Sequence, residues 1–237
     1  MRNSAQWARV KRSLPMPLLY SNLPEMPPID LNLEDIERSG LPQNVAGVDE
    51  AGRGAWFGAV VAAAVMLTQP QRELLQQAGA TDSKKLTAVR REELAIAIRQ
   101  HARAWALGWA HPHDIDRVNI LQATFLAARR ALYWLDPPPH ACAMDGNHRI
   151  AKLKLPQIAV VKGDSKCIEI AFASILAKTH RDRWMQCLAK RYPGYDLAAN
   201  KGYGTPAHRR GVERLGTTPL HRLSYGPCQQ RSLPLET

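Results

Sequence analysis

Two short apolar segments of this chain end in acidic residues, and this pattern limits the folds that the chain can adopt. Residues 45–48 lead directly into Asp49 and Glu50, and residues 141–144 lead into Asp145. In an open α/β sheet, ligands gather at the carboxyl ends of the strands. We therefore interpret both segments as strands and expect their terminal acids to face a common site.

Further strands and helices are predicted from hydrophobic periodicity and from capping residues. The other strand candidates are residues 59–67, 102–109 and 158–161. Helices are predicted to begin near Thr87 and Asn119, and the longest spans residues 168–191. Strands first, then strands mixed with helices, indicate an α/β domain around one central sheet.

Residues 1–44 differ from the rest of the chain in composition and in hydrophobic periodicity. Prolines punctuate them and no periodicity persists. We expect a flexible, basic, proline-containing extension at residues 1–44 and a folded domain at residues 45–237. Residues 1–24 carry basic but no acidic side chains, which leaves an organelle transit peptide as an alternative.

The charge and the cysteines narrow the class of protein further. A net charge of +11 favours a polyanionic partner such as nucleic acid, although a basic protein without such a partner is the alternative. The four cysteines form no C-x-x-C pair, which argues against a structural zinc site and for a reducing compartment. No apolar run is long enough to span a membrane. We therefore expect a cytoplasmic protein.

The acids are the candidates for chemistry. Asp182 lies on the predicted helix over residues 168–191 and faces the same point as Asp49 if that helix packs on the sheet. Converging carboxylates need cations, and oxygen ligands favour Mg²⁺ or Mn²⁺ over zinc. Two such ions, about 4 Å apart, can activate water against a phosphodiester. Any single aspartate can instead be a helix cap or a turn residue, and His111 and His113 lack a third zinc ligand nearby.

Residues 45–54, which read VAGVDEAGRG, resemble the signature opening of the ribonuclease HII family. Other segments match blocks of that family in the same order. They are residues 82–86 (DSKKL), 119–124 (NILQAT), 144–146 (MDG), 161–164 (VKGD), 173–182 (ASILAKTHRD), 201–205 (KGYGT) and 221–225 (HRLSY). The resemblance covers residues 45–228.

This resemblance implies an α/β, ribonuclease H-like fold, with a central mixed sheet flanked by helices and a helical C-terminal part. It places the family's acidic quartet at Asp49, Glu50, Asp145 and Asp182, with two Mg²⁺ or Mn²⁺ ions in the active complex. The implied activity is endonucleolytic cleavage of the RNA strand of RNA–DNA hybrids and cleavage 5′ of ribonucleotides embedded in duplex DNA. The expected ends are 3′-hydroxyl and 5′-phosphate, the expected role is ribonucleotide excision repair, and the family is usually monomeric.

Substrate contacts are expected from a glycine-rich turn, a tyrosine and several lysines. Glycines at Gly52 and Gly54, on either side of Arg53, let the backbone approach a nucleotide, and exposed backbone groups can bond a 2′-hydroxyl. Tyr203 matches the family tyrosine that packs on the sugar of the ribonucleotide. The candidates for phosphate contacts are Lys84, Lys85, Lys162 and Lys178. An ordinary turn, a partly buried tyrosine and solvated lysines are the alternative interpretations.

The chain departs from the family pattern at a few positions. Residues 55–59 read AWFGA where a Pro-Leu-Ala/Val-Gly run is usual, so we expect a looser turn with Trp56 near the substrate path. Phe172 replaces a small residue, and Leu223 and Tyr225 replace a typical Arg and Phe. Two rival functions remain: another nuclease or transposase on the same fold, which would lack the turn and Tyr203, and a basic binding module without catalysis. The presence of all four acids argues against the second.

Overall fold

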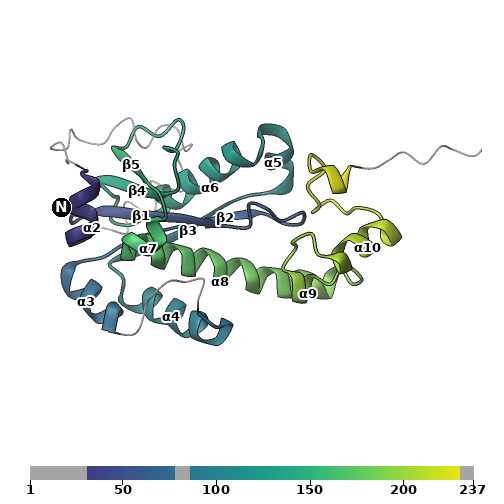
Figure 1. The fold of residues 1–237 in the computed structure, drawn as a ribbon, viewed down its shortest axis with the longest axis horizontal. Coiled ribbons are helices and arrows are strands. Elements are labelled where there is room, and N and C mark those ends of the chain that lie inside the picture. Colours follow the sequence, from purple (N-terminus) through teal and green to yellow (C-terminus); the bar gives the residue numbers. More distant parts are fainter. Residues whose placement is uncertain (1–30, 78–85, 230–237) are drawn as a thin grey trace, which may run out of the picture.

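The computed structural model describes residues 31–77 and 86–229, which form a five-stranded sheet with helices on both faces (Figure 1). The strand order is β3-β2-β1-β4-β5. The strands are β1 (Val45–Ala51), β2 (Val60–Met66), β3 (Ala104–Ala110), β4 (Ala141–Asp145) and β5 (Gln157–Val160). The pairs β1–β2 and β2–β3 are antiparallel, and β1–β4 and β4–β5 are parallel. The predicted mixed sheet is confirmed.

The register of β1 and β4 explains why their acids meet. Val48 lies opposite Met144, so the residues that follow each of them emerge at the same edge of the sheet. Because the two strands are parallel, Asp49 and Asp145 leave them in the same direction. The sequence pattern of an apolar strand followed by an acid therefore brings these carboxylates to one place.

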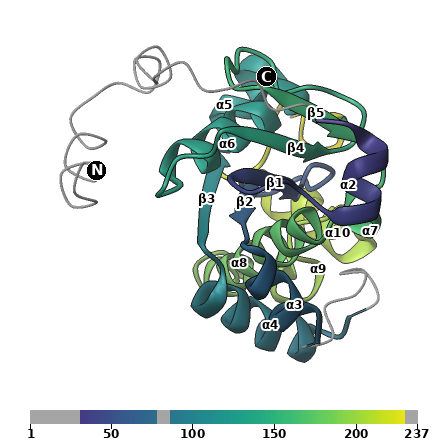
Figure 2. The same ribbon diagram turned by 90° about the vertical axis from the view of Figure 1, so that its left-hand side faces the viewer.

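Helices cover both faces of the sheet (Figure 2). The longer helices are α3 (Gln69–Gln77), α4 (Ala88–His101), α6 (Ile120–Trp134), α8 (Ile168–Arg191) and α10 (Pro206–Leu215). The shorter ones are α2 (Leu33–Ser39), α5 (Pro112–Val118), α7 (Gly163–Lys166), α9 (Leu197–Asn200) and a 3₁₀ turn at Gly226–Cys228. No helix within the described ranges is long and apolar enough to cross a membrane.

The two faces bury separate parts of the core. Helix α6 packs on one face through Ala123, Ala127 and Ala131, which recur at helical spacing and are wholly buried. Small residues let its backbone come close to β3, where a side chain at Gly108 would collide with it. The opposite face buries α4 and α8, and Phe172 of α8 is wholly buried there.

Helix α8 lies unusually close to β1. A side chain at Gly47 would collide with the backbone of Glu169 and Ile170, so only glycine permits this approach. The helix begins and ends at the predicted residues, 168 and 191. Its path beyond the sheet leads to the C-terminal part, where Met185 packs against Phe57 and Tyr195.

The expected boundary between residues 44 and 45 needs a correction for the described part of the extension. Helix α2 lies before this boundary, and its Ile36 is only 2% exposed. Ile36 and Leu41 pack against Val45 of β1 and Ala141 of β4. Residues 31–44 are therefore packed on the sheet rather than detached from it, because these two apolar side chains are buried there.

Candidate active site

Three of the predicted acids gather at the carboxyl ends of β1 and β4. Asp49 is 6% exposed, and its carboxylate accepts hydrogen bonds from the Glu50 N–H, at 2.7 Å, and from the Ser174 hydroxyl of α8. Burial, followed by the negative charges of Glu50 and Asp145, raises the pKa of Asp49 well above its ordinary value. A bound cation would offset the repulsion among these carboxylates and favour the ionised form of Asp49.

The other two acids of this group have different partners. Burial raises the pKa of Glu50, Arg53 opposes this effect, and Asp145 adds to it. The Arg53 guanidinium lies 3.4 Å from Glu50 Oε1. Asp145 Oδ1 accepts a hydrogen bond of 2.6 Å from the Gly163 N–H. The backbone at the start of α7 therefore holds Asp145 in place.

The fourth predicted acid, Asp182, lies further along helix α8 than Ser174, the residue that contacts Asp49. It lies eight residues beyond Ser174 on α8, which corresponds to about 12 Å along the helix axis. Its Oδ1 accepts a hydrogen bond of 2.8 Å from Lys178 Nζ. Asp182 is thus the partner of a lysine one turn away, while Ser174 is the residue of α8 that reaches Asp49.

A different acid, Asp164 of α7, was not among the site residues predicted from the sequence. It follows Gly163, whose N–H bonds Asp145, and it is only 9% exposed. The sequence signal for it is the VKGD run at residues 161–164, in which Lys162 was the predicted site residue. Within residues 31–77 and 86–229, no group of three or more acidic, histidine or cysteine side chains is close enough together to hold a metal ion in this arrangement.

A hollow of about 470 Å³ opens beside Glu50 and joins the predicted site residues to the acids. Its lining residues are Glu50, Ala51, Gly52, Arg53, Gly54, Arg91, Ser174, Lys178 and Tyr203. The glycine-rich turn and the tyrosine, about 150 residues apart in the sequence, therefore border one space. Arg91 of α4 is a basic side chain of this hollow that the sequence analysis did not identify.

The two glycines of the turn have different reasons to be glycine. Gly52 has a φ of +92°, and a side chain there would also overlap the Arg181 guanidinium. Glycine is therefore required at position 52 by the fold itself. At Gly54, nothing lies within 4 Å of the point that a Cβ would occupy. The described part of the chain leaves open space beside Gly54, where a bound molecule can approach the backbone.

Tyr203 is held between the turn and helix α8. It forms an isolated bridge with Ala55, and its ring centroid lies 5.3 Å from the Arg181 guanidinium and 5.7 Å from Lys178 Nζ. Its carbonyl lies 3.0 Å from His208 Nδ1. The ring therefore borders the hollow with cationic groups beside it, in a position that its neighbours fix from several directions.

The other predicted residues take up varied positions. Lys162 is exposed and precedes Gly163 of α7, which places it next to the backbone that holds Asp145. Lys84 and Lys85 lie outside the described residues. Trp56 packs on Gly204 and lies beside the His208 ring, with centroids 5.6 Å apart. These contacts join Trp56 to the C-terminal part, and its position near the substrate path stays a prediction.

Comparisons with known proteins agree with this arrangement. A family model described as Ribonuclease HII matches residues 46–228. A protein named Ribonuclease HII from Acaryochloris marina is 53% identical over 192 residues, which cover 81% of this chain and 97% of that protein. The crystal structure of the ribonuclease H2 from Pyrococcus horikoshii has a TM-score of 0.69 and 26% identity, and covers 78% of this chain and 94% of that one. Bst-RNase HIII in complex with Mn²⁺ shares the fold, with a TM-score of 0.64, 21% identity and coverage of 78% and 68%.

Proposed function

This chain belongs to the ribonuclease HII family and is a ribonuclease H that hydrolyses the RNA of RNA–DNA hybrids, and we propose that it also cuts 5′ of single ribonucleotides embedded in duplex DNA. One observation carries this proposal. The same hollow is lined by Glu50 of the acid group, by the turn at residues 52–54 and by Tyr203. A site that tests the sugar therefore lies directly beside a site that can act on the phosphodiester.

The acids are suited to divalent cations. Burial and mutual repulsion raise the pKa of Asp49 and Glu50, so bound positive charge would favour their ionised forms. All candidate ligands are carboxylate oxygens, which favours Mg²⁺ or Mn²⁺. We propose Asp49, Glu50 and Asp145 as metal ligands, with Asp164 in place of Asp182 as the fourth. When bound, such ions supply the charge that activates water and stabilises the leaving oxygen.

The chain's own groups orient these ligands before any ion binds. The Ser174 hydroxyl fixes Asp49, and the Gly163 N–H fixes Asp145. Asp182 keeps a role in this scheme through the 2.8 Å bond with Lys178, whose side chain lines the hollow. We assign Lys178 to a phosphate of the substrate, with Asp182 setting its direction.

Recognition of the ribonucleotide rests on the turn and on Tyr203. A single 2′-hydroxyl separates an RNA–DNA junction from plain DNA, and sensing it needs polar groups and a constraint on the sugar. The open space beside Gly54 admits the sugar to the backbone of the turn, and the Tyr203 ring packs on its other side. Cleavage on the 5′ side of that ribonucleotide leaves 3′-hydroxyl and 5′-phosphate ends.

Basic side chains around the hollow supply affinity that is independent of base sequence. Arg91 and Lys178 line the hollow, and the exposed Lys162 lies near Asp145. Together with the net charge of +11, these groups favour phosphate contacts that weaken as salt rises. The monomeric state, the cytoplasmic location and the role in ribonucleotide excision repair stay predictions.

The decisive experiment uses a labelled DNA duplex with one ribonucleotide, the same duplex in all-DNA form, and an RNA–DNA hybrid. We expect Mg²⁺-dependent cutting of the hybrid and a single cut 5′ of the ribonucleotide, with no cutting of the DNA duplex and none in the presence of chelator. Cutting of the all-DNA duplex would instead indicate a general nuclease. Binding without cutting in any metal would indicate a non-catalytic nucleic-acid-binding module.

A further inference from the structure

Two arginines in the described part of the chain are wholly buried, although charged side chains are seldom buried without a carboxylate partner. Arg181 of α8 and Arg222 of the C-terminal segment are both 0% exposed. In the described residues, neither donates a hydrogen bond to a carboxylate; their donors go to backbone carbonyls and to one tyrosine hydroxyl. Burial of a guanidinium is unfavourable in itself, so the placement of these two calls for an explanation.

Arg222 donates hydrogen bonds to the backbone carbonyls of the glycine-rich turn. Its Nη2 donates to the Gly52 carbonyl at 2.7 Å, its Nη1 to the Arg53 carbonyl at 2.7 Å, and its Nε to the Gly58 carbonyl at 3.0 Å. Its backbone N–H donates to the Trp56 carbonyl at 2.8 Å. Arg222 therefore contacts both ends and the middle of a turn that lies about 170 positions earlier in the sequence.

Arg181 completes the same arrangement from helix α8. It donates to the carbonyls of Phe57, at 3.1 Å, and Ala59, at 3.2 Å. Its Nη1 donates to the Lys201 carbonyl at 2.8 Å, and its guanidinium lies under the ring of Tyr203. Arg181 thus connects the end of the turn to the loop that carries the tyrosine.

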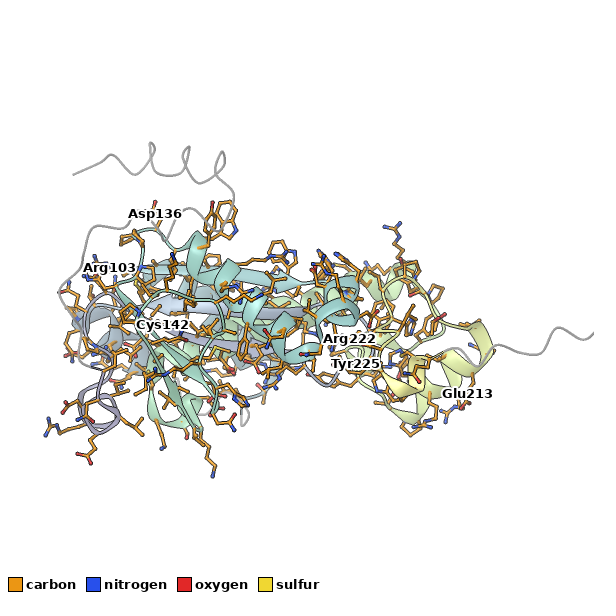
Figure 3. All side chains as sticks on the ribbon, turned by 90° about the horizontal axis from the view of Figure 1, so that it is seen from above. Arg103, Asp136, Cys142, Glu213, Arg222 and Tyr225 are labelled. Carbon is orange, nitrogen blue, oxygen red and sulfur yellow. The ribbon has the colours of Figure 1, made fainter. Side chains whose placement is uncertain are left out.

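Tyr225 adds a contact that a phenylalanine cannot make. Its hydroxyl donates to the Arg53 carbonyl at 2.6 Å and accepts from Arg222 Nη1 at 3.2 Å. Figure 3 shows Arg222 and Tyr225 next to each other at the junction between the sheet and the C-terminal part. The hydroxyl thus connects Arg222 directly to the backbone of the turn.

These contacts turn the carbonyls of the turn toward the protein interior. The N–H groups of Arg53 and Gly54 have no acceptor among the described residues. With the carbonyls of Gly52 and Arg53 held from behind, these two donors are left for a ligand in the hollow that the same residues line. A backbone that is fixed in its bound conformation loses less entropy when the ligand arrives.

We propose that Arg181, Arg222 and Tyr225 are positioning residues that preset the turn at residues 52–58 for recognition of the ribonucleotide's 2′-hydroxyl. They touch neither the sugar nor the acids and act through the backbone that they hold. The proposal rests on the proposed function, because it explains how that function distinguishes one hydroxyl group. It also assigns the C-terminal segment to substrate selection rather than to fold stability alone.

The test measures binding without cleavage. Fluorescence anisotropy in chelator gives the Kd for a duplex with one ribonucleotide and for the same duplex in all-DNA form, and the ratio of the two is the preference. Tyr225→Phe removes both hydrogen bonds of the hydroxyl. We expect it to lower the preference at least about fivefold, the factor for the loss of a single hydrogen bond. Arg222→Lys, which cannot reproduce a planar fork of donors, should abolish most of the preference. Each variant is measured at a temperature where it is fully folded.

Arg72→Lys is the matched control. Arg72 is also buried, at 8% exposure, and also donates to a carbonyl, that of Leu41, but it pairs with Glu169 away from the turn. Arg72→Lys should lower the melting temperature while it keeps the wild-type preference. If Tyr225→Phe and Arg222→Lys also keep that preference, the inference is overturned. If Arg222→Lys does not fold, Tyr225→Phe decides alone. A wild type with neither preference nor cleavage would overturn the proposed function instead.

Discussion

Matched substitutions at Asp182 and Asp164 distinguish between two candidates for the fourth acid of the site. The sequence suggests Asp182, and the structure suggests Asp164. Asp164→Asn and Asp182→Asn each remove one negative charge and keep the shape of the side chain. Asp164 is buried next to the residue that holds Asp145, whereas Asp182 lies about 12 Å along α8 from the residue that reaches Asp49. The two changes are therefore expected to differ greatly in their effect on the rate.

The structure sets the size of each effect. Loss of a direct ligand should exceed the 10- to 100-fold loss that is typical when only a partner of a ligand is removed. We expect Asp164→Asn to lower the single-turnover rate at least about 100-fold, which corresponds to ~2.7 kcal/mol of barrier. The pair of Asp182 with Lys178 is partly exposed and contributes about 0.5 kcal/mol, so Asp182→Asn should cost only about twofold.

The assay is single-turnover cleavage of a duplex with one ribonucleotide at saturating Mg²⁺, together with calorimetric titration of Mg²⁺ in the absence of substrate. Asp35→Asn is the control, because Asp35 is an exposed acid of α2 paired with Arg38, and the same change there should leave rate and Mg²⁺ affinity unaltered. Asp164→Asn should also weaken Mg²⁺ binding. The reasoning is refuted if Asp182→Asn loses more than about a hundredfold while Asp164→Asn stays within threefold of the wild type.

Three further predictions concern the sugar contact and the stability of the fold. Tyr203→Ala should lower cleavage at a single ribonucleotide at least about tenfold in single-turnover kinetics, with a smaller loss in duplex binding, and unchanged cleavage would exclude the packing role. Burial and the neighbouring His208 lower the pKa of His221 to about 4 from its ordinary value of 6.5. Neutral His221 therefore contributes stability fully above pH 6.5, and this contribution is lost as pH falls toward 4. In urea unfolding, the wild type should lose about 3 kcal/mol more over this range than His221→Gln, and equal losses would contradict the assignment. Ile36→Ala should lower the free energy of unfolding by about 2–4 kcal/mol, whereas a change under about 0.5 kcal/mol would show that α2 is detached.

The sequence predicted the elements whose signals are local. Thr87 and Asn119 cap α4 and α6 as expected, because a capping side chain acts on N–H groups two or three residues away. Helix α8 also has the predicted ends, although the side chain of Cys167 at its N-terminus makes no capping hydrogen bond. Helix α2 was missed, since a seven-residue helix that buries one isoleucine leaves no repeating pattern among prolines.

The site was predictable only in part because position along a helix depends on packing. Ser174, Lys178 and Asp182 are spaced by four residues and share one face of α8, so periodicity places all three toward the same side. Which of them meets Asp49 depends on where the helix crosses β1, and that is set by the close approach at Gly47. Arg181 and Arg222 received no role from the sequence because buried arginines are rare.

Helix α8 also fixes the spacing between three side chains of the proposed site. Within about two turns it presents the hydroxyl that orients Asp49, the lysine of the hollow and the arginine that holds the turn proposed to contact the sugar. Insertion of one residue between Ser174 and Arg181 would rotate one end by about 100° against the other and shift it by about 1.5 Å. Under the proposed roles, this rigid spacing makes the cut fall at one fixed phosphodiester relative to the ribonucleotide. Under these roles, the spacing of residues along one helix sets the distance between the ribonucleotide and the bond that is cut. A change in that spacing would alter the cleavage position and the recognition of the ribonucleotide together.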